Sequence, residues 1–137
     1  MTAKDDYLEV DKANRREAAR VMKIVLKARD YSSARKGKEA RDEMEKALDI
    51  LARLEKRSKA AYKKYKRAKD TEQVDEDVLE LAKEQVGLLR KMRRYARDML
   101  DAVAGAEDLS KYTEDELAEI ESTEGRLMQL FKLMFNN

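Results

Sequence analysis

The acidic side chains of this sequence come closest to the spacing of a chemical site in one stretch near its middle. That stretch holds Asp70, Glu72, Asp75, Asp77 and Glu80. Carboxylates at alternating positions are the ligands of a calcium-binding loop, but such a loop needs a glycine at its sharp turn, and this stretch has none. Acidic residues are also favoured at the positive end of a helix. We therefore predict that the stretch begins a helix and binds no metal.

The side chains needed for most other chemistry are absent, because the sequence contains no His and no Cys. His is the common general base and transition-metal ligand. Cys is required for disulfides, thiol nucleophiles and thiolate-bound metals. The four glycines lie too far apart in the sequence to form a phosphate-binding loop. These absences predict a protein that is not an enzyme, holds no cofactor and acts on no small-molecule substrate.

Basic residues are concentrated in the first half of the chain. Residues 1–69 carry 22 Lys/Arg and 12 Asp/Glu, a net charge of +10, whereas residues 70–137 carry 9 and 17, a net charge of −8. The densest basic run is 53–69, and a second run is 90–97. Helices with rows of Lys and Arg can follow a phosphate backbone without reading base sequence. The predicted nucleic-acid-binding residues are Arg15, Arg16, Arg20, Lys23, Lys27, Lys56, Lys59, Lys63, Lys64, Lys66, Arg67, Arg90, Arg93, Arg94 and Arg97.

Internal pairing is the alternative interpretation of this charge pattern. If residues 40–69 and 74–103 form an antiparallel hairpin, Lys63 and Lys66 lie beside Glu80 and Glu84. The acids of 42–49 then lie beside the basic run 90–97. Such a hairpin would neutralise much of its own charge and leave less of it for a partner.

The composition predicts long helices, because the sequence has no Pro, four Gly and many residues with high helix propensity. We predict an all-α fold in one domain, 1–137: an elongated bundle of about four helices centred on a long antiparallel coiled-coil-like hairpin. The first helix is expected over about 6–29, starting at Asp5 or Asp6, and the hairpin over about 34–104. Ser32 or Ser33 is expected to cap the second helix.

Apolar residues recur at alternating intervals of three and four in both arms of this hairpin, as in a heptad repeat. The expected buried row of the second arm is Val74, Val78, Leu81, Gln85, Leu88, Met92, Tyr95, Met99 and Ala102. With the turn at 70–73, Leu54 faces Met92. Gly105 is expected to end the second arm in a left-handed conformation. The sequence leaves open whether the first helix folds back onto the hairpin or extends away as an arm.

A last helix is predicted over about 114–135, where Thr113 and Glu116 form a capping box. Its final turns are apolar on nearly every side, which is too wide for one contact face. This surface either packs against 21–26 of the first helix or binds another subunit. If the protein self-associates, we expect the contact to form through this surface. The predicted partner-binding residues are Leu127, Met128, Leu130, Phe131, Leu133, Met134 and Phe135.

The sequence also bears on localisation and role. No apolar run approaches the roughly 18 residues of a membrane span, and the N-terminus lacks a signal-peptide pattern. We therefore expect a soluble intracellular protein without membrane contact, in the cytoplasm or within a virion or other assembly. The predicted role is a non-enzymatic assembly subunit on nucleic-acid backbone, as in a filamentous capsid. The alternative is a scaffold, adaptor, chaperone or designed bundle that binds only protein.

Overall fold

Four α-helices and one short 3-10 helix make up the structure, a computed structural model that describes residues 2–136. Their bounds are α1 Ala3–Ser33, α2 Gly37–Arg67, η1 Ala68–Asp70, α3 Glu76–Ala104 and α4 Glu114–Asn136. The predicted all-α bundle with a long α2–α3 hairpin is confirmed. None of these helices is long and apolar enough to cross a bilayer.

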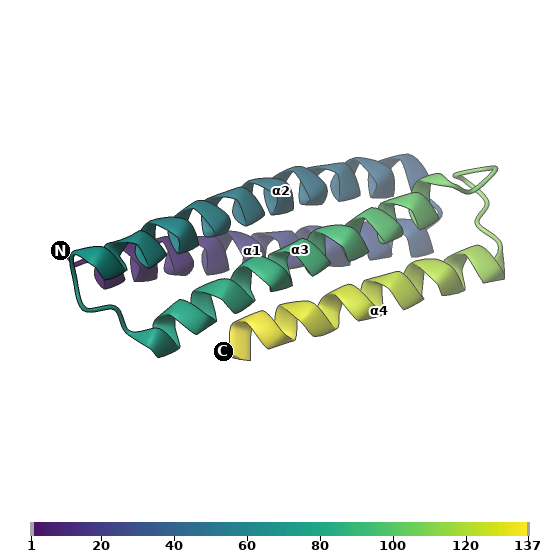
Figure 1. The fold of residues 1–137 in the computed structure, drawn as a ribbon. Helices are drawn as coiled ribbons and strands as arrows, with labels where there is room; N and C mark the ends of the chain where they lie inside the picture. The colour runs from purple at the N-terminus through teal and green to yellow at the C-terminus, as the bar shows by residue number, and fades with distance from the viewer. Residues whose placement is uncertain (1, 137) are drawn as a thin grey trace.

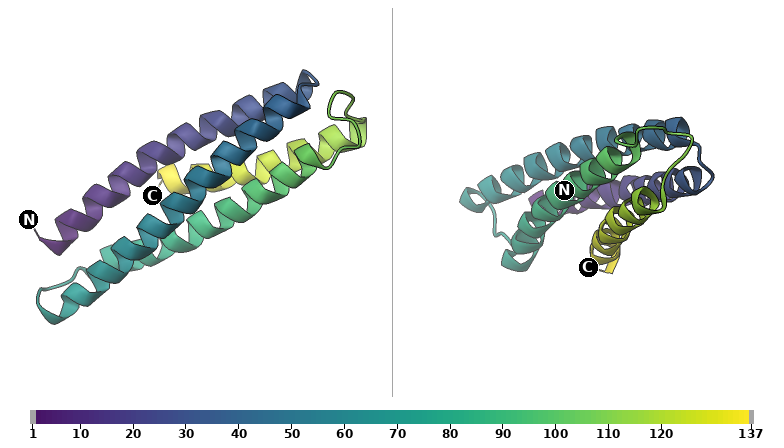
Figure 2. Two further views of the ribbon diagram at one scale, coloured as in Figure 1. Left: turned by 90° about the horizontal axis from the view of Figure 1, so that it is seen from above. Right: turned by 90° about the vertical axis from the view of Figure 1, so that its right-hand side faces the viewer.

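The helices run up and down in turn, so that each one contacts two neighbours. The neighbouring pairs are α1–α2, α2–α3, α3–α4 and α1–α4 (Figures 1 and 2). Because α4 has 23 residues against 31 in α1, it stops short of the end where the N-terminus and the α2–α3 turn lie (Figure 1). The bundle therefore has four helices at one end and three at the other, which we call the three-helix end.

Helix α1 folds back along α2, which answers the question that the sequence left open. It begins earlier than expected, because Thr2 and not Asp5 or Asp6 is the N-cap, with Asp5 completing a capping box. It also continues to Ser33, so the expected cap by Ser32 or Ser33 is wrong. The Ser32 hydroxyl instead donates to the Ala28 carbonyl at 3.0 Å, and Arg35 makes the turn with a positive φ of 61°.

The register of the hairpin agrees with the heptads, since Glu55, next to Leu54, pairs with Arg90 and Arg93, which lie on either side of Met92. Leu54 and Met92 are both fully buried. In the row expected to be buried in α3, Gln85, Met92 and Met99 are buried as predicted, but the residues between them are not the most deeply buried ones. Leu81, Leu88, Tyr95 and Ala102 are only partly buried, whereas the neighbouring Ala82, Leu89, Ala96 and Val103 are fully buried. The reason is that α3 packs against both α2 and α4, so the centre of its buried face lies between the two. Gly105 ends α3 with a φ of −81°, which corrects the expected left-handed conformation.

The capping box at the start of α4 is confirmed. Thr113 accepts from the Glu116 backbone N–H at 3.1 Å, and Glu116 accepts from that of Thr113 at 2.8 Å. Four of the seven apolar residues predicted to bind a partner are buried in the chain's own core with Val21 and Val25, and Met128 packs against that core. The four buried residues are Leu127, Leu130, Phe131 and Met134. Only Leu133 (54% exposed) and Phe135 (38%) remain accessible.

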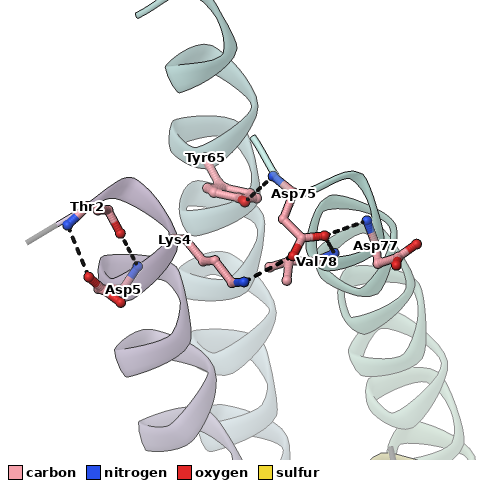
Figure 3. A network of polar contacts seen from close by, with 7 residues as sticks. All are labelled: Thr2, Lys4, Asp5, Tyr65, Asp75, Asp77 and Val78. Carbon is pink, nitrogen blue, oxygen red and sulfur yellow. Dashed lines mark hydrogen bonds and ion pairs between the residues drawn. The ribbon is translucent and has the colours of Figure 1, made fainter. Parts of the chain in front are cut away.

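Polar contacts hold the three-helix end together (Figure 3). Asp75 caps α3 by accepting from the backbone N–H groups of Asp77 and Val78, and it also receives Lys4 Nζ from α1 at 3.0 Å. The Tyr65 hydroxyl of α2 accepts from the backbone N–H of Asp75 at 2.9 Å. Contacts from three helices thus meet at Asp75, those of α1 and α3 at its carboxylate and that of α2 at its backbone N–H. Its partners, Lys4 first and then the N–H donors, lower the pKa of Asp75 below its ordinary value.

Asp75→Asn should remove this ion pair while keeping a side chain that can still cap α3. A lowered pKa means that the Asp75 carboxylate stabilises the fold above pH 3.8, the ordinary value, and that this contribution is lost as the pH falls through the native pKa. Thermal melts should therefore show the variant less stable than wild type at pH 7, with the gap closing below about pH 3.8. Asp98→Asn is the control and should show no such gap. An equal gap at pH 7 and pH 3 would contradict this assignment.

Gly37→Ala should destabilise the protein, because the added Cβ would collide with the loop between α3 and α4. It would lie 2.6 Å from both Leu109 Cβ and the Tyr112 hydroxyl. A Cβ at Gly87 meets nothing within 4 Å. Gly87→Ala is the matched control and should stabilise the protein by about 0.5–1 kcal/mol, the ordinary gain from replacing glycine within a helix. Urea unfolding followed by circular dichroism measures both, and the expectation fails if both substitutions stabilise.

Candidate polyanion interface

The charge of α2 divides near the middle of the helix. Residues 37–52 hold three Lys/Arg and five Asp/Glu, whereas residues 53–67 hold eight Lys/Arg and one acid, Glu55. All eight basic residues of 53–67, which we call the basic half of α2, are exposed. Because α2 runs toward the α2–α3 turn, this basic half lies at the three-helix end (Figure 1).

A groove of about 540 Å³ lies between α2 and α3 and is lined mainly by arginine. Its lining residues are Leu48, Asp49, Ala52, Arg90, Arg93, Arg94 and Arg97. The four arginines share one face of α3 because their spacings of three, four and seven match the helical repeat. Leu48 and Ala52 of α2 supply an apolar wall. We call this feature the arginine groove.

Glu55 of α2 fixes two of these arginines. Its carboxylate, only 11% exposed, lies 3.2 Å from Arg90 Nε and 3.0 Å from Arg93 Nε. Both contacts use the Nε atoms, so the terminal nitrogens of both guanidinium groups stay free of Glu55. Within residues 2–136, Arg94 and Arg97 have no carboxylate within 4.0 Å. The arginine groove therefore combines two oriented and two unpaired guanidinium groups.

A shallower groove of about 330 Å³ lies between α1 and α2. It is lined by Glu17, Arg53, Lys56 and Arg57. Arg57 forms an ion pair with Glu17, so part of its positive charge is already neutralised. Lys56 belongs to the basic half of α2 and lines this second groove, on the side of α2 that faces α1.

The structure does not bring all fifteen predicted basic residues onto one surface. Arg15 is engaged internally by the Asp11 carboxylate at 2.8 Å and by the Met134 carbonyl. Arg16 lines a groove on the α1–α4 side. Lys27 lies 4.0 Å from Glu43 and 5.6 Å from the centre of the Tyr31 ring. Arg20 and Lys23 are exposed on α1. Of the remaining ten, the four of α3 line the arginine groove: Arg90, Arg93, Arg94 and Arg97. Lys56 and Lys64 of α2 line depressions shared with α1. Lys59, Lys63, Lys66 and Arg67 are exposed along α2.

Charge pairing between the arms of the hairpin is sparser than the internal-pairing alternative expects. The ion pairs that link α2 or η1 to α3 are those of Glu55 with Arg90 and Arg93, and of Lys69 with Glu76 at 3.2 Å. Within the described part of the chain, Lys63 and Lys66 form no ion pair with Glu80 or Glu84. The basic half of α2 therefore faces solvent.

The acidic stretch at 70–80 behaves as a helix start, with Asp75 as the cap of α3. Across residues 2–136, no group of three or more acidic side chains is placed to hold a metal ion. Carboxylates also line a groove of about 460 Å³ beside the first half of α2. Its acidic residues are Glu39, Asp42, Glu43, Glu45 and Asp49.

The sequence predicts the four arginines of the groove. It does not predict the residues of α2 that form its wall or that orient the arginines. Glu55 is the single acid of the basic run 53–69, yet it orients Arg90 and Arg93. Its position next to Leu54, a core residue of the heptad, was the available signal, because a charged residue there lies at the edge of the helix contact. Leu48, Asp49 and Ala52 carried no comparable signal.

Comparison of the chain with protein-family models, with curated proteins and with solved structures gives no match. Only the residues of the chain itself therefore bear on its function.

Proposed function

We propose that this protein is a non-catalytic polyanion-binding subunit, and that nucleic-acid backbone is its ligand. The observation that carries the proposal is the arginine groove, where four guanidinium groups of α3 line one depression next to the point at which the basic half of α2 begins. Planar guanidinium groups bind phosphate oxygens through paired hydrogen bonds, which makes arginine a strong phosphate ligand. The lack of His and Cys in the sequence supports the part of the proposal that assigns no catalysis.

The binding expected of this surface is independent of base sequence. Lys and Arg of α2 and α3 would contact phosphates, and no aromatic ring lines the arginine groove to stack on bases. The affinity should therefore come mostly from counterion release and fall steeply with added salt. Such binding suits an assembly subunit that covers a nucleic acid of any sequence.

The combined variant Arg94→Glu with Arg97→Glu tests this proposal, because both residues are exposed and lie outside the buried core. Fluorescence anisotropy with labelled single- and double-stranded oligonucleotides at 50 mM salt should show binding by wild type. The variant should bind about tenfold or more weakly. Its plot of log affinity against log salt should be shallower by about one for each phosphate group that the variant no longer binds.

The control for this experiment makes the same change of net charge elsewhere. Lys111, in the loop before α4, and Lys132, on α4, are exposed and do not line the arginine groove. The pair Lys111→Glu and Lys132→Glu should keep most of the affinity. Equal weakening in both double variants would show attraction to overall charge alone. No binding by wild type at 50 mM salt would reject the proposal.

Self-association is a second candidate, and the exposed end of α4 favours it. Phe135 lines an open groove of about 560 Å³ with Ala19 and Met22 of α1, and this groove is mainly apolar. Leu8 of α1 is also exposed, at 39%. Exposed apolar groups gathered on one side can mark a protein contact. The contact would involve Leu133 and Phe135 rather than the seven residues first predicted, because the other five are wholly or partly buried.

Leu133→Ser with Phe135→Ser tests the second candidate, since both side chains are exposed. Phe135 also stacks on the buried Phe131, so a thermal melt must show that the variant stays folded. If the C-terminal end of α4 joins copies of the chain, light scattering should show a lower mass for this variant than for wild type. The helical content measured by circular dichroism should not change. An equal mass for wild type and variant removes this surface as an assembly contact.

A further inference from the structure

We infer that the arginine groove is a site for a terminal oligophosphate, the linked two or three phosphoryl groups found on a nucleotide or at the 5′ end of a nucleic acid. The inference rests on the proposed function and narrows it, because it assigns the groove to the end of a polyanion instead of its continuous backbone. Three observations support it: the length of the groove, the acids at one end of it and the positioning of its arginines.

The arginine groove is short. Arg90 and Arg97 are seven residues apart, which at 1.5 Å per residue places their Cα atoms about 10 Å apart along the helix. The volume of about 540 Å³ is typical of a small-ligand site. A chain of two or three directly linked phosphoryl groups is short enough to lie within that length and contact several of the four guanidinium groups at once.

Acidic residues close one end of the groove. Asp49 is part of its lining, and Glu45 lies one helical turn before Asp49, toward the N-terminus of α2. On α3, Asp101 follows Arg97 by four residues and is exposed on the same face. A phosphate backbone running on past Arg97 would therefore meet carboxylates, which repel it. The ligand must end at this point.

Toward the opposite end the exposed residues of α2 are basic, whereas α3 carries the exposed acids Glu80 and Glu84 there. Lys56 follows Ala52 by one helical turn, and Lys59 and Lys63 follow at intervals of three and four, all of them exposed. On α3, Lys83 precedes Arg90 by seven residues and is also exposed. A nucleic acid could thus lie along the basic half of α2 and place its phosphorylated end in the arginine groove.

The charge inside the groove also suits a compact ligand. Arg90 and Arg93 are held by Glu55, so they are already ordered before a ligand binds, and less entropy is lost on binding. Four arginines set against Glu55 and Asp49 leave an excess of two positive charges. A triphosphate can contact more of the four guanidinium groups at once than a single sulfate or phosphate can, because its phosphoryl groups extend along the groove.

Isothermal titration calorimetry with the full chain at 100 mM salt tests the inference, using inorganic tripolyphosphate and sulfate as probes. Wild type should bind tripolyphosphate about tenfold or more tightly than sulfate. Arg94→Gln with Arg97→Gln should bind tripolyphosphate about tenfold more weakly, whereas the control pair Lys111→Gln with Lys132→Gln should change little. Equal affinity for the two anions, or equal weakening in the two double variants, would overturn the inference.

A second arm separates the two sources of such a ligand and separates this inference from the proposed function. RNA oligonucleotides of one sequence, carrying either a 5′-triphosphate or a 5′-hydroxyl, are compared in the anisotropy assay. Tighter binding of the triphosphorylated strand, abolished in the Arg94/Arg97 variant, identifies a chain end as the ligand. Binding of tripolyphosphate with no binding of either strand identifies a free oligophosphate and rejects the nucleic-acid function alone. Equal binding of both strands, without tripolyphosphate binding, keeps that function and rejects this inference.

Discussion

The packing of α2 against two partners at once is the interaction on which the rest of the structure depends. Ala40 and Ala47 are fully buried together with Leu51 and Leu54, so small and large side chains alternate along the buried face of α2. Burial of each leucine stabilises the fold by about 1.5–3 kcal/mol. This face fixes the register of the hairpin, and the register brings Glu55 opposite Arg90 and Arg93. A shift of α2 by one turn would separate these groups and remove the arginine groove.

The unequal helix lengths divide the interior into two parts. The main core lies where all four helices meet, and a small cluster of Tyr7, Tyr65 and Ala82 lies at the three-helix end. Between them Asn14 and Gln85 are buried, and within the described residues Asn14 Oδ1 and both polar atoms of the Gln85 side chain lack a hydrogen-bond partner. Such groups cost about 1–3 kcal/mol each. The three-helix end has the smaller of the two apolar clusters, and it carries the basic half of α2.

Folding changes what the charge pattern means. Along the sequence the chain looks like a basic half followed by an acidic half, but in the bundle these halves lie side by side. The sharp boundary that remains is within α2, between Asp49 and Arg53, and it lies next to the arginine groove. An interface with acids at one end and lysines at the other has a direction. A uniformly basic surface would give attraction without direction, because it would offer equivalent contacts along its length.

The sequence by itself determined the helices, the hairpin and its register, because heptad spacing and caps such as Thr113 with Glu116 act between residues close in the chain. It also placed Arg90, Arg93, Arg94 and Arg97 on one helical face. Tertiary structure alone decided what those arginines face, that Arg15 is engaged internally, and that most of the apolar end of α4 is buried. The row of α3 that is most deeply buried was likewise decided by its packing against both α2 and α4. The physical reason is that local spacing fixes the direction of a side chain on its own helix, whereas its exposure depends on which other helix covers that direction.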